Sequence, residues 1–298
     1  MPPRPRGTAV IQKRLGAELR RIREARGLRL DDVADELQVS PSTVSRIETG
    51  HTVPKVWEVR ALAEFYATGP DAAAELVEWA GALKEGGWWR PIAKSLQADI
   101  QYLVSLESES TEIRNLCVPA IYGLLQAPLY ARELFRAMLP DATDSRIDEL
   151  VELRMRRQEI VTRSDDPVRL HVIADEACLH RPMGSAETTR EQLGVLLERA
   201  ALPNVTLQVL GHHQPFHRGA VTGFTVFIPR LPDVDPEVVS LERLDQEVFE
   251  EANVDLYQAA FTSLSRHAMD PTASRELIDH IRSGRSPAAP RESGKGQQ

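Results

Sequence analysis

The chain has 298 residues, of which 42% are hydrophobic and 27% are charged, and its net charge is −8. This length allows a small module and one larger domain with its own hydrophobic core. No apolar run approaches the ~18 residues of a membrane helix, and no apolar stretch follows the N-terminal arginines, so we expect neither a membrane span nor a secretory signal. The two cysteines, Cys117 and Cys178, are far apart in the sequence, which favours reduced thiols in a cytoplasmic protein.

Positive charge is concentrated at the N-terminal end of the chain. Residues 1–66 carry 12 Lys and Arg against 9 Asp and Glu, a net charge of +3, whereas the remainder carries a net charge of −11. Within residues 1–30 the net charge is +7. A basic end on an acidic body is typical of a protein in which only one end meets the phosphates of a nucleic acid.

Composition divides the chain into four segments. Residues 1–12 are rich in proline and arginine and predict a flexible arm, whereas residues 13–84 predict short helices separated by glycine and proline. Residues 84–87 hold two glycines and form a candidate junction to a second domain over residues 88–282. Residues 283–298 predict a disordered tail. The expected fold class is α+β overall, with an all-α N-terminal domain of five helices followed by a mixed α+β domain.

The N-terminal helices are predicted from apolar spacing and from residues that begin or end helices. The first helix has an apolar stripe at i, i+4 and i+7, formed by Leu15, Leu19 and Ile22. It ends near Gly27, and a second helix covers residues 31–37. Ser40 and Pro41 begin the third helix, because serine is a good N-cap and proline suits the first helical position. A fourth helix covers residues 56–66.

The outward face of the third helix is short-chained and polar. At about 100° per residue, Val44 and Ile47 face the core. The opposite side carries four polar residues: Ser42, Thr43, Ser45 and Arg46. Serine and threonine approach bases or phosphates closely, and arginine can donate two hydrogen bonds to one guanine. This face favours a helix in the major groove of DNA, although a plain helical bundle without DNA contact has the same periodicity.

Residues 15–66 resemble the lambda-repressor-like, Cro-type helix-turn-helix family, also named for the xenobiotic response element (XRE). The matching residues are Leu15, Gly16, Leu19, Arg20, Arg23, Gly27, Leu28, Val33, Ala34, Leu37, residues 39–48, Gly50 and Pro54. The resemblance implies sequence-specific DNA binding in which Ser42, Thr43 and Arg46 contact bases.

Further site residues come from the basic positions and from the same resemblance. We expect phosphate contacts from Arg14, Arg21, Ser45 and Lys55, although a solvated surface is the alternative for each charged residue taken alone. Arg23 and Glu48 match a pair that in this family joins the first helix to the end of the third. The alternative for Arg23 is a solvated surface arginine.

Two positions depart from the family pattern. Leu30 stands where the family usually has a phosphate-binding glutamine, which removes one expected DNA contact. Gln38 stands where the turn usually has glycine, and a residue with a side chain resists the left-handed conformation at a cost of ~1 kcal/mol. Neither departure changes the expected fold.

The second domain has a mixed pattern without strict strand–helix alternation. Short strands are predicted at residues 111–118, 168–174, 205–210, 223–229 and 238–241. Helices are predicted at residues 95–110, 128–138, 145–163, 188–201, 254–269 and 273–282. This pattern predicts a mixed α+β domain.

Residues 88–282 resemble the C-terminal domain, of unknown function, of actinobacterial antitoxin-like regulators. The matching stretches are residues 87–89, 123–126, 130–131, 154–158, 176–179, 192–196 and 223–224. Tyr122 departs from the proline that this class more often has before the Gly-Leu-Leu-Gln run. Regulators of this class are often encoded beside a small protein that they bind, so the resemblance implies a small co-encoded protein partner.

The second domain offers little recognisable chemistry. Residues 88–282 contain no nucleophile, zinc-protease or nucleotide-binding motif, so we expect no enzyme and no cofactor. Three imidazoles lie within six residues: His212, His213 and His217. They could reach one zinc ion, but a loop with incidental histidines is the simpler interpretation, and we expect no metal. Asp175 and Glu176 fit helix capping better than a carboxylate pair, and Cys178 with His180 fits packing better than a nucleophile.

The leading hypothesis is a homodimeric regulator that binds a double-stranded DNA operator and responds to a partner protein or ligand through residues 88–282. The alternative is an antitoxin-like protein that sequesters a small co-encoded partner and binds DNA only to regulate its own gene. A third class, an enzyme tethered to DNA, lacks catalytic motifs in the sequence. A neighbouring gene for a small protein would favour the second class, and metal analysis would test the third.

Overall fold

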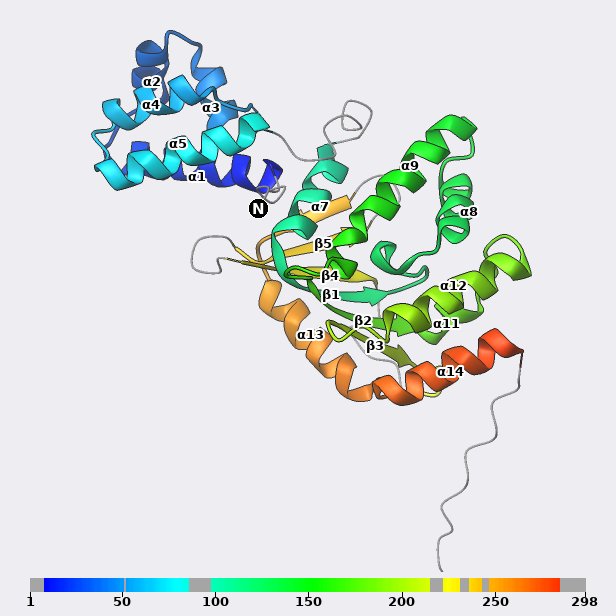
Figure 1. Ribbon diagram of the computed structural model, residues 1–298. Coiled ribbons are helices and arrows are strands. Elements are labelled where there is room, and N and C mark those ends of the chain that lie inside the picture. The colour runs from blue at the N-terminus through cyan, green and yellow to red at the C-terminus, as the bar shows by residue number, and fades with distance from the viewer. Residues whose placement is uncertain are drawn as a thin grey trace, which may run out of the picture. The chain divides into compact units, whose positions relative to one another are not determined.

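The structure is a computed structural model, and it describes residues 8–50, 52–85, 98–214, 222–230, 236–242 and 247–284 (Figure 1). The chain forms two compact units, Met1–Ser110 with Pro229–Pro236 and Thr111–Ile228 with Glu237–Gln298. Residues 86 and 87 of the predicted junction and most of the predicted tail lie outside the described residues. No helix within the described ranges is long and apolar enough to cross a membrane.

Helices form most of the described part of the first unit. They are α1 (Thr8–Ala25), α2 (Leu30–Leu37), α3 (Pro41–Glu48), α4 (Val56–Phe65), α5 (Pro70–Glu85) and α7 (Ala98–Glu109). The first five correspond to the five helices predicted from the sequence, so the all-α fold of this domain is confirmed. α7 packs on α1, where the Nζ atom of Lys13 lies 3.8 Å from the ring centroid of Tyr102. The first unit therefore extends beyond the predicted domain of residues 13–84.

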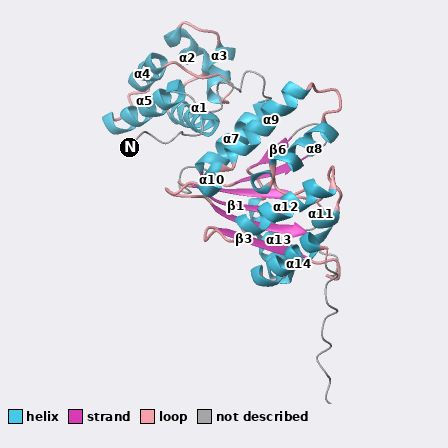
Figure 2. Ribbon diagram, turned by 45° about the vertical axis from the view of Figure 1, so that its right-hand side comes forward, coloured by secondary structure: helices cyan, strands magenta, loops and turns pink. Residues whose placement is uncertain are grey.

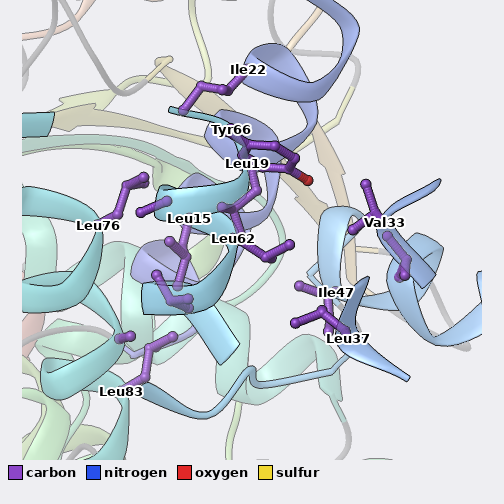
Figure 3. Packing of buried hydrophobic residues seen from close by; sticks show 14 of the residues in the cluster. Leu15, Leu19, Ile22, Val33, Leu37, Ile47, Leu62, Tyr66, Leu76 and Leu83 are labelled. Atoms are coloured by element: carbon purple, nitrogen blue, oxygen red, sulfur yellow. The ribbon is translucent and has the colours of Figure 1, made fainter. Parts of the chain in front are cut away.

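The five helices from α1 to α5 share one hydrophobic core. Leu15 and Leu19 of α1 are fully buried, and Figure 3 shows them with Leu62 of α4 and Leu76 of α5. Ile47 brings α3 into the same cluster. Burial of each such side chain contributes about 1.5–3 kcal/mol to folding.

The predicted flexible arm of residues 1–12 is too long. α1 already begins at Thr8, and Ile11 is buried. Ile11 stands four residues before Leu15 and extends the apolar stripe by one turn, which explains the earlier start of the helix. Residues 1–7 lie outside the described part of the chain.

The turn between α2 and α3 contains a strained residue. Gln38 adopts the left-handed conformation, with φ 53° and ψ 44°. Its N–H donates to the carbonyl of Asp35 at 3.3 Å, and the N–H of Val39 donates to that of Ala34 at 3.0 Å, so the turn satisfies the last carbonyls of α2. The left-handed conformation expected at Gln38 is confirmed, and its cost of ~1 kcal/mol stays a prediction.

The end of α3 is in direct backbone contact with α1. Gly16 is buried, and a Cβ atom there would lie 2.4 Å from the carbonyl oxygen of Ile47 and 2.7 Å from that of Glu48. A larger residue at this position would therefore displace α3. One turn earlier, Nε2 of Gln12 donates to the carbonyl of Gly50 at 3.0 Å. These two contacts fix the C-terminal end of α3 against α1.

A buried ion pair between Arg23 of α1 and Glu48 of α3 is the third contact that holds the two helices together. Nε and Nη2 of Arg23 donate to the two carboxylate oxygens of Glu48 at 2.6 and 2.9 Å, and Nη1 of Arg23 donates to the carbonyl of Leu28 at 2.9 Å. Only 8% of Arg23 and 7% of Glu48 is exposed. The hydrogen bond to Glu48 raises the pKa of Arg23, and burial beside the Glu48 charge raises the pKa of the Tyr66 hydroxyl. The arginine therefore stays charged and the tyrosine neutral.

The second unit is built on a six-stranded sheet with the order β3-β2-β1-β4-β5-β6 (Figure 2). The strands are β1 (Ser110–Cys117), β2 (Arg169–Asp175), β3 (Val205–Leu210), β4 (Phe224–Pro229), β5 (Val238–Glu242) and β6 (Glu247–Glu250). β1, β2 and β3 are parallel, whereas the β4–β5 and β5–β6 pairs are antiparallel. Asn115 links β1 to β4, because its Nδ2 donates to Oγ1 of Thr225 at 2.9 Å.

Helices lie on both faces of this sheet. They are η1 (Gly123–Leu125), α8 (Pro128–Met138), α9 (Asp144–Arg157), α10 (Glu159–Thr162), α11 (Glu176–His180), α12 (Ala186–Arg199), α13 (Val254–His267) and α14 (Pro271–Ser283). In Figure 1, α8, α9 and α12 lie on the opposite side of the sheet from α13. Phe261 and Leu264 of α13 are buried in one cluster with Leu116, Ile173 and Val226 of the sheet. The predicted mixed α+β class is confirmed.

Glutamines satisfy the buried backbone around η1. Nε2 of Gln158 donates to the carbonyls of Gly123 at 3.0 Å and Gln126 at 2.8 Å. Nε2 of Gln192 donates to the carbonyl of Leu125 at 2.8 Å. Buried carbonyls outside regular secondary structure need such partners. Both glutamines belong to the stretches that carry the resemblance of the second domain, so a structural role accounts for them.

Two features of the sheet differ from the sequence prediction. Strands and helices do alternate from β1 to β3, but the connection between β1 and β2 contains three α-helices, which obscures the alternation in the sequence. β6 is absent from the predicted strands, because its residues are half-buried and begin and end with glutamate, Glu247 and Glu250. It pairs only with β5, at the edge of the sheet.

Replacing Gln38 by glycine should stabilise the first unit. Gln38→Gly removes the Cβ atom from a left-handed residue, and we expect the free energy of unfolding to rise by up to ~1 kcal/mol. Urea unfolding followed by circular dichroism measures the change. Asp35→Gly, inside α2, is the control and should instead lower the free energy of unfolding by roughly 0.3 kcal/mol, because glycine is a poorer helix former than aspartate. Equal losses in both variants would contradict the strain at Gln38.

Removing Glu48 should destabilise the first unit strongly. Glu48→Ala leaves the buried Arg23 guanidinium without its carboxylate, at an expected cost of ~3–5 kcal/mol. Thermal unfolding of the full chain measures this. Glu24→Ala removes a 52% exposed carboxylate that bonds Arg20 at 2.8 Å and approaches Nη2 of Arg23 only to 3.5 Å, and it should change stability by less than ~1 kcal/mol. A Glu48→Ala protein that melts like wild type would show that the pair does not hold α3.

Candidate nucleic-acid interface

α3 presents a polar face to solvent and an apolar face to α1. The exposed residues of the helix are Pro41, Ser42 and Arg46, and Thr43 and Ser45 are half-buried. The buried residues are Val44, Ile47 and Glu48. The structure thus groups the predicted base-contacting residues on one side of α3, with the attachment to α1 behind them.

Hydroxyl groups gather at the start of α3. Oγ of Ser40 accepts from the N–H of Thr43 at 3.2 Å, and it lies 2.8 Å from Oγ of Ser42 and 2.9 Å from Oγ1 of Thr43. Ser40 therefore caps the helix, as predicted, and orients two neighbouring hydroxyls. This end of the helix carries the positive pole of its dipole, which favours nearby phosphate.

Arg46 is the long donor on the polar face of α3. Its side chain is exposed and has no hydrogen bond or ion pair to any residue that the structure describes. Its planar guanidinium can therefore bond O6 and N7 of a guanine without first breaking an internal contact.

Three of the four predicted phosphate contacts are accessible. Ser45 is half-buried on α3, and Lys55, directly before α4, has a 70% exposed side chain with Nζ 3.9 Å from Oε1 of Glu58. Arg21 is 68% exposed and donates to both carboxylate oxygens of Glu18 at 2.7 and 2.6 Å. Exposed ion pairs contribute little stability, so a DNA phosphate can replace Glu18 at small cost.

Arg14, the fourth predicted phosphate contact, packs against α5 in the structure. The guanidinium carbon of Arg14 lies 4.0 Å from the ring centroid of Trp79, and Nη2 lies 3.6 Å from Oε1 of Glu75. Only 14% of the side chain is exposed. These contacts hold the guanidinium against α5, where its low exposure makes contact with a phosphate less favourable. The sequence did not reveal this because Trp79 is distant from Arg14 along the chain.

The sequence candidates in the second unit have mainly structural roles. Oδ1 of Asp175 accepts from the N–H two residues later at 2.8 Å and caps α11, as predicted. Cys178 is buried, and burial raises the pKa of its thiol to about 12, so the reactive thiolate is scarce at neutral pH. His212 and His213 are exposed in the loop after β3, and His217 lies outside the described residues.

Comparison with known proteins assigns both parts of the chain. Residues 14–76 match a family described as a helix-turn-helix domain, and residues 100–280 match a domain of unknown function, DUF5753. The HTH-type transcriptional regulator DdrOP3 of Deinococcus deserti is 37% identical over 78 residues, which are 24% of this chain and 60% of that protein. The chain thus spans 60% of the length of this curated relative. No solved structure matches the chain significantly.

The helix-turn-helix match contains α2, α3 and α4 entirely, and with them Ser42, Thr43 and Arg46. It agrees with the XRE-type resemblance of residues 15–66. The second match covers more than half of the 298 residues. The chain belongs to the DUF5753 family, and it joins this domain of unknown function to an N-terminal XRE-type helix-turn-helix domain.

Proposed function

We propose that the protein is a sequence-specific transcriptional regulator that binds an operator in double-stranded DNA through α3. The observation that carries this proposal is the exposed polar face of α3, on which Arg46 has no partner in the described part of the chain. The other face is fixed to α1 by the Arg23–Glu48 pair. A rigidly attached reading helix loses little conformational entropy on binding.

Each residue of the proposed interface has a distinct role. Arg46 discriminates guanine from other bases through two parallel hydrogen bonds, which its shorter neighbours cannot make. Ser42 and Thr43 make single hydrogen bonds to bases or phosphates near the start of the helix. Arg21 and Lys55 neutralise phosphates of the DNA backbone and contribute affinity without sequence preference.

The second unit has a different proposed role. Residues 111–228 and 237–298, which form the second unit, carry 20 Lys and Arg against 26 Asp and Glu, a net charge of −6, so DNA repels this unit, and contacts with a protein or a small ligand are more favourable there. We propose that it binds a small protein partner, as in the antitoxin-like regulators that it resembles, or an effector ligand, and has no catalytic role. Binding at this unit would regulate DNA binding by the first.

The proposed base contact predicts a specific defect in Arg46→Ala. Selection of binding sites from random DNA should yield a motif that has lost its preference at one base pair, and the best wild-type site should bind ~1–3 kcal/mol more weakly. Arg46→Lys keeps the charge but not the two-pronged geometry, so it should not restore the preference.

Two matched variants separate base reading from general charge. Lys55→Ala should weaken binding to all sequences about equally. The slope of the logarithm of the binding constant against the logarithm of the salt concentration should also become smaller in magnitude by about one, which corresponds to one lost phosphate contact. Arg60→Ala removes another exposed arginine, on α4, and should leave the selected motif unchanged. If folded Arg46→Ala selects the wild-type motif, Arg46 does not read a base.

The protein should bind its operator as a homodimer. One α3 reads only a few base pairs, so we expect two chains on an inverted repeat whose half-sites are about one helical turn apart. Analytical ultracentrifugation of the complex with the selected site measures the number of chains. One chain bound to a site without internal symmetry would contradict the dimer.

A further inference from the structure

Three side chains that commonly bind metal ions meet at one edge of the sheet in the second unit. Glu176 is the first residue of α11, directly after β2, and His180 lies one turn later on the same helix. His212 is the second residue after β3. One possible ligand atom from each of the three lies within 4.8 Å of the other two.

The fold brings these residues together through the sheet. β2 and β3 are parallel, and Asp175 pairs with Leu210 at their carboxyl ends, so the segments that follow the two strands are neighbours. Oε2 of Glu176 accepts from the backbone N–H of His212 at 2.9 Å. This hydrogen bond joins the loop after β3 to the start of α11. It therefore holds His212 close to the two ligand residues on α11, Glu176 and His180.

The separations fit one small cation. Nε2 of His180 lies 3.5 Å from Oε1 of Glu176. In a tetrahedral zinc site with bonds of about 2.0–2.1 Å, neighbouring ligand atoms lie about 3.3 Å apart. The rings of His180 and His212 are stacked, with centroids 5.9 Å apart and an angle of 28° between their planes. Since both imidazoles are exposed, small rotations bring their nitrogens to a common ion.

We propose that Glu176, His180 and His212 bind a divalent transition-metal ion of the zinc class. Two imidazoles and one carboxylate suit Zn²⁺, Co²⁺ or Ni²⁺, whereas Mg²⁺ and Ca²⁺ prefer oxygen ligands alone. The Glu176 side chain is only 16% exposed and that of His180 is 49% exposed, so the ion is anchored from one side and open to water on the other. A solvent molecule completes the coordination.

A simpler interpretation is a surface ion pair. Glutamate and histidine four residues apart on a helix attract each other weakly without any metal, and His212 would then be an incidental neighbour. The two interpretations differ in what His212 does. In a metal site it supplies a ligand as important as His180, whereas in a surface pair its removal changes no metal affinity.

The site replaces the histidine cluster considered from the sequence. That hypothesis grouped the imidazoles of one loop, His212, His213 and His217. The structure brings His212 close to residues after another strand, and the Glu176–His180 spacing shows no metal motif in the sequence. The site also does not depend on DNA binding, since all its residues lie in the second unit.

The test is metal titration of the metal-free full-length protein. Isothermal titration calorimetry with Zn²⁺, and visible absorption with Co²⁺, should show one bound ion per chain with a tetrahedral cobalt spectrum. His180→Asn, His212→Asn and Glu176→Gln should each weaken binding by roughly tenfold or more. Circular dichroism checks that each variant is folded.

Two matched controls use histidines outside the site. His267 on α13 and His280 on α14 have their Nδ1 atoms 2.7 and 2.9 Å from the carbonyl oxygens four residues earlier. His267→Asn and His280→Asn should bind Zn²⁺ like wild type. The proposal is overturned if wild type binds no ion, or if folded His212→Asn retains the wild-type affinity and cobalt spectrum.

Discussion

The attachment of α3 to α1 is the constraint on which the proposed DNA-reading face depends. α3 has eight residues, and its buried apolar side chains are Val44 and Ile47, which provide a small area for fixing its orientation. The backbone contact at Gly16 sets how closely α1 approaches, and the Arg23–Glu48 pair sets the rotation about that contact. A change in either would move Ser42, Thr43 and Arg46, the side chains of α3 that are proposed to reach DNA.

An ion pair suits this task better than an apolar contact would. Two hydrogen bonds between a guanidinium and a carboxylate allow one relative orientation, whereas apolar side chains of similar volume allow several. The pair is also buried beside Tyr66, whose raised pKa keeps the hydroxyl neutral. The same burial that makes the pair costly to break shields it from salt, so the helix stays in place under conditions that weaken DNA binding.

In the second unit, the parallel strands β2 and β3 position the proposed metal-binding residues, as the contacts with α1 position α3 in the first unit. They align the residues that follow β2 and β3 at one edge of the sheet, where Glu176, His180 and His212 meet. Elsewhere in this unit, the glutamines around η1 hold buried backbone in an irregular path.

The sequence by itself determined the features that depend on near neighbours in the chain. Apolar spacing and capping residues located α2 to α4 and most strands, and the positive φ of Gln38 followed from its place in the turn. Only the tertiary structure decided that Arg14 stacks on Trp79 and that His212 meets Glu176. Helix periodicity and capping act over a few residues, whereas such contacts join side chains that folding brings together from distant parts of the chain.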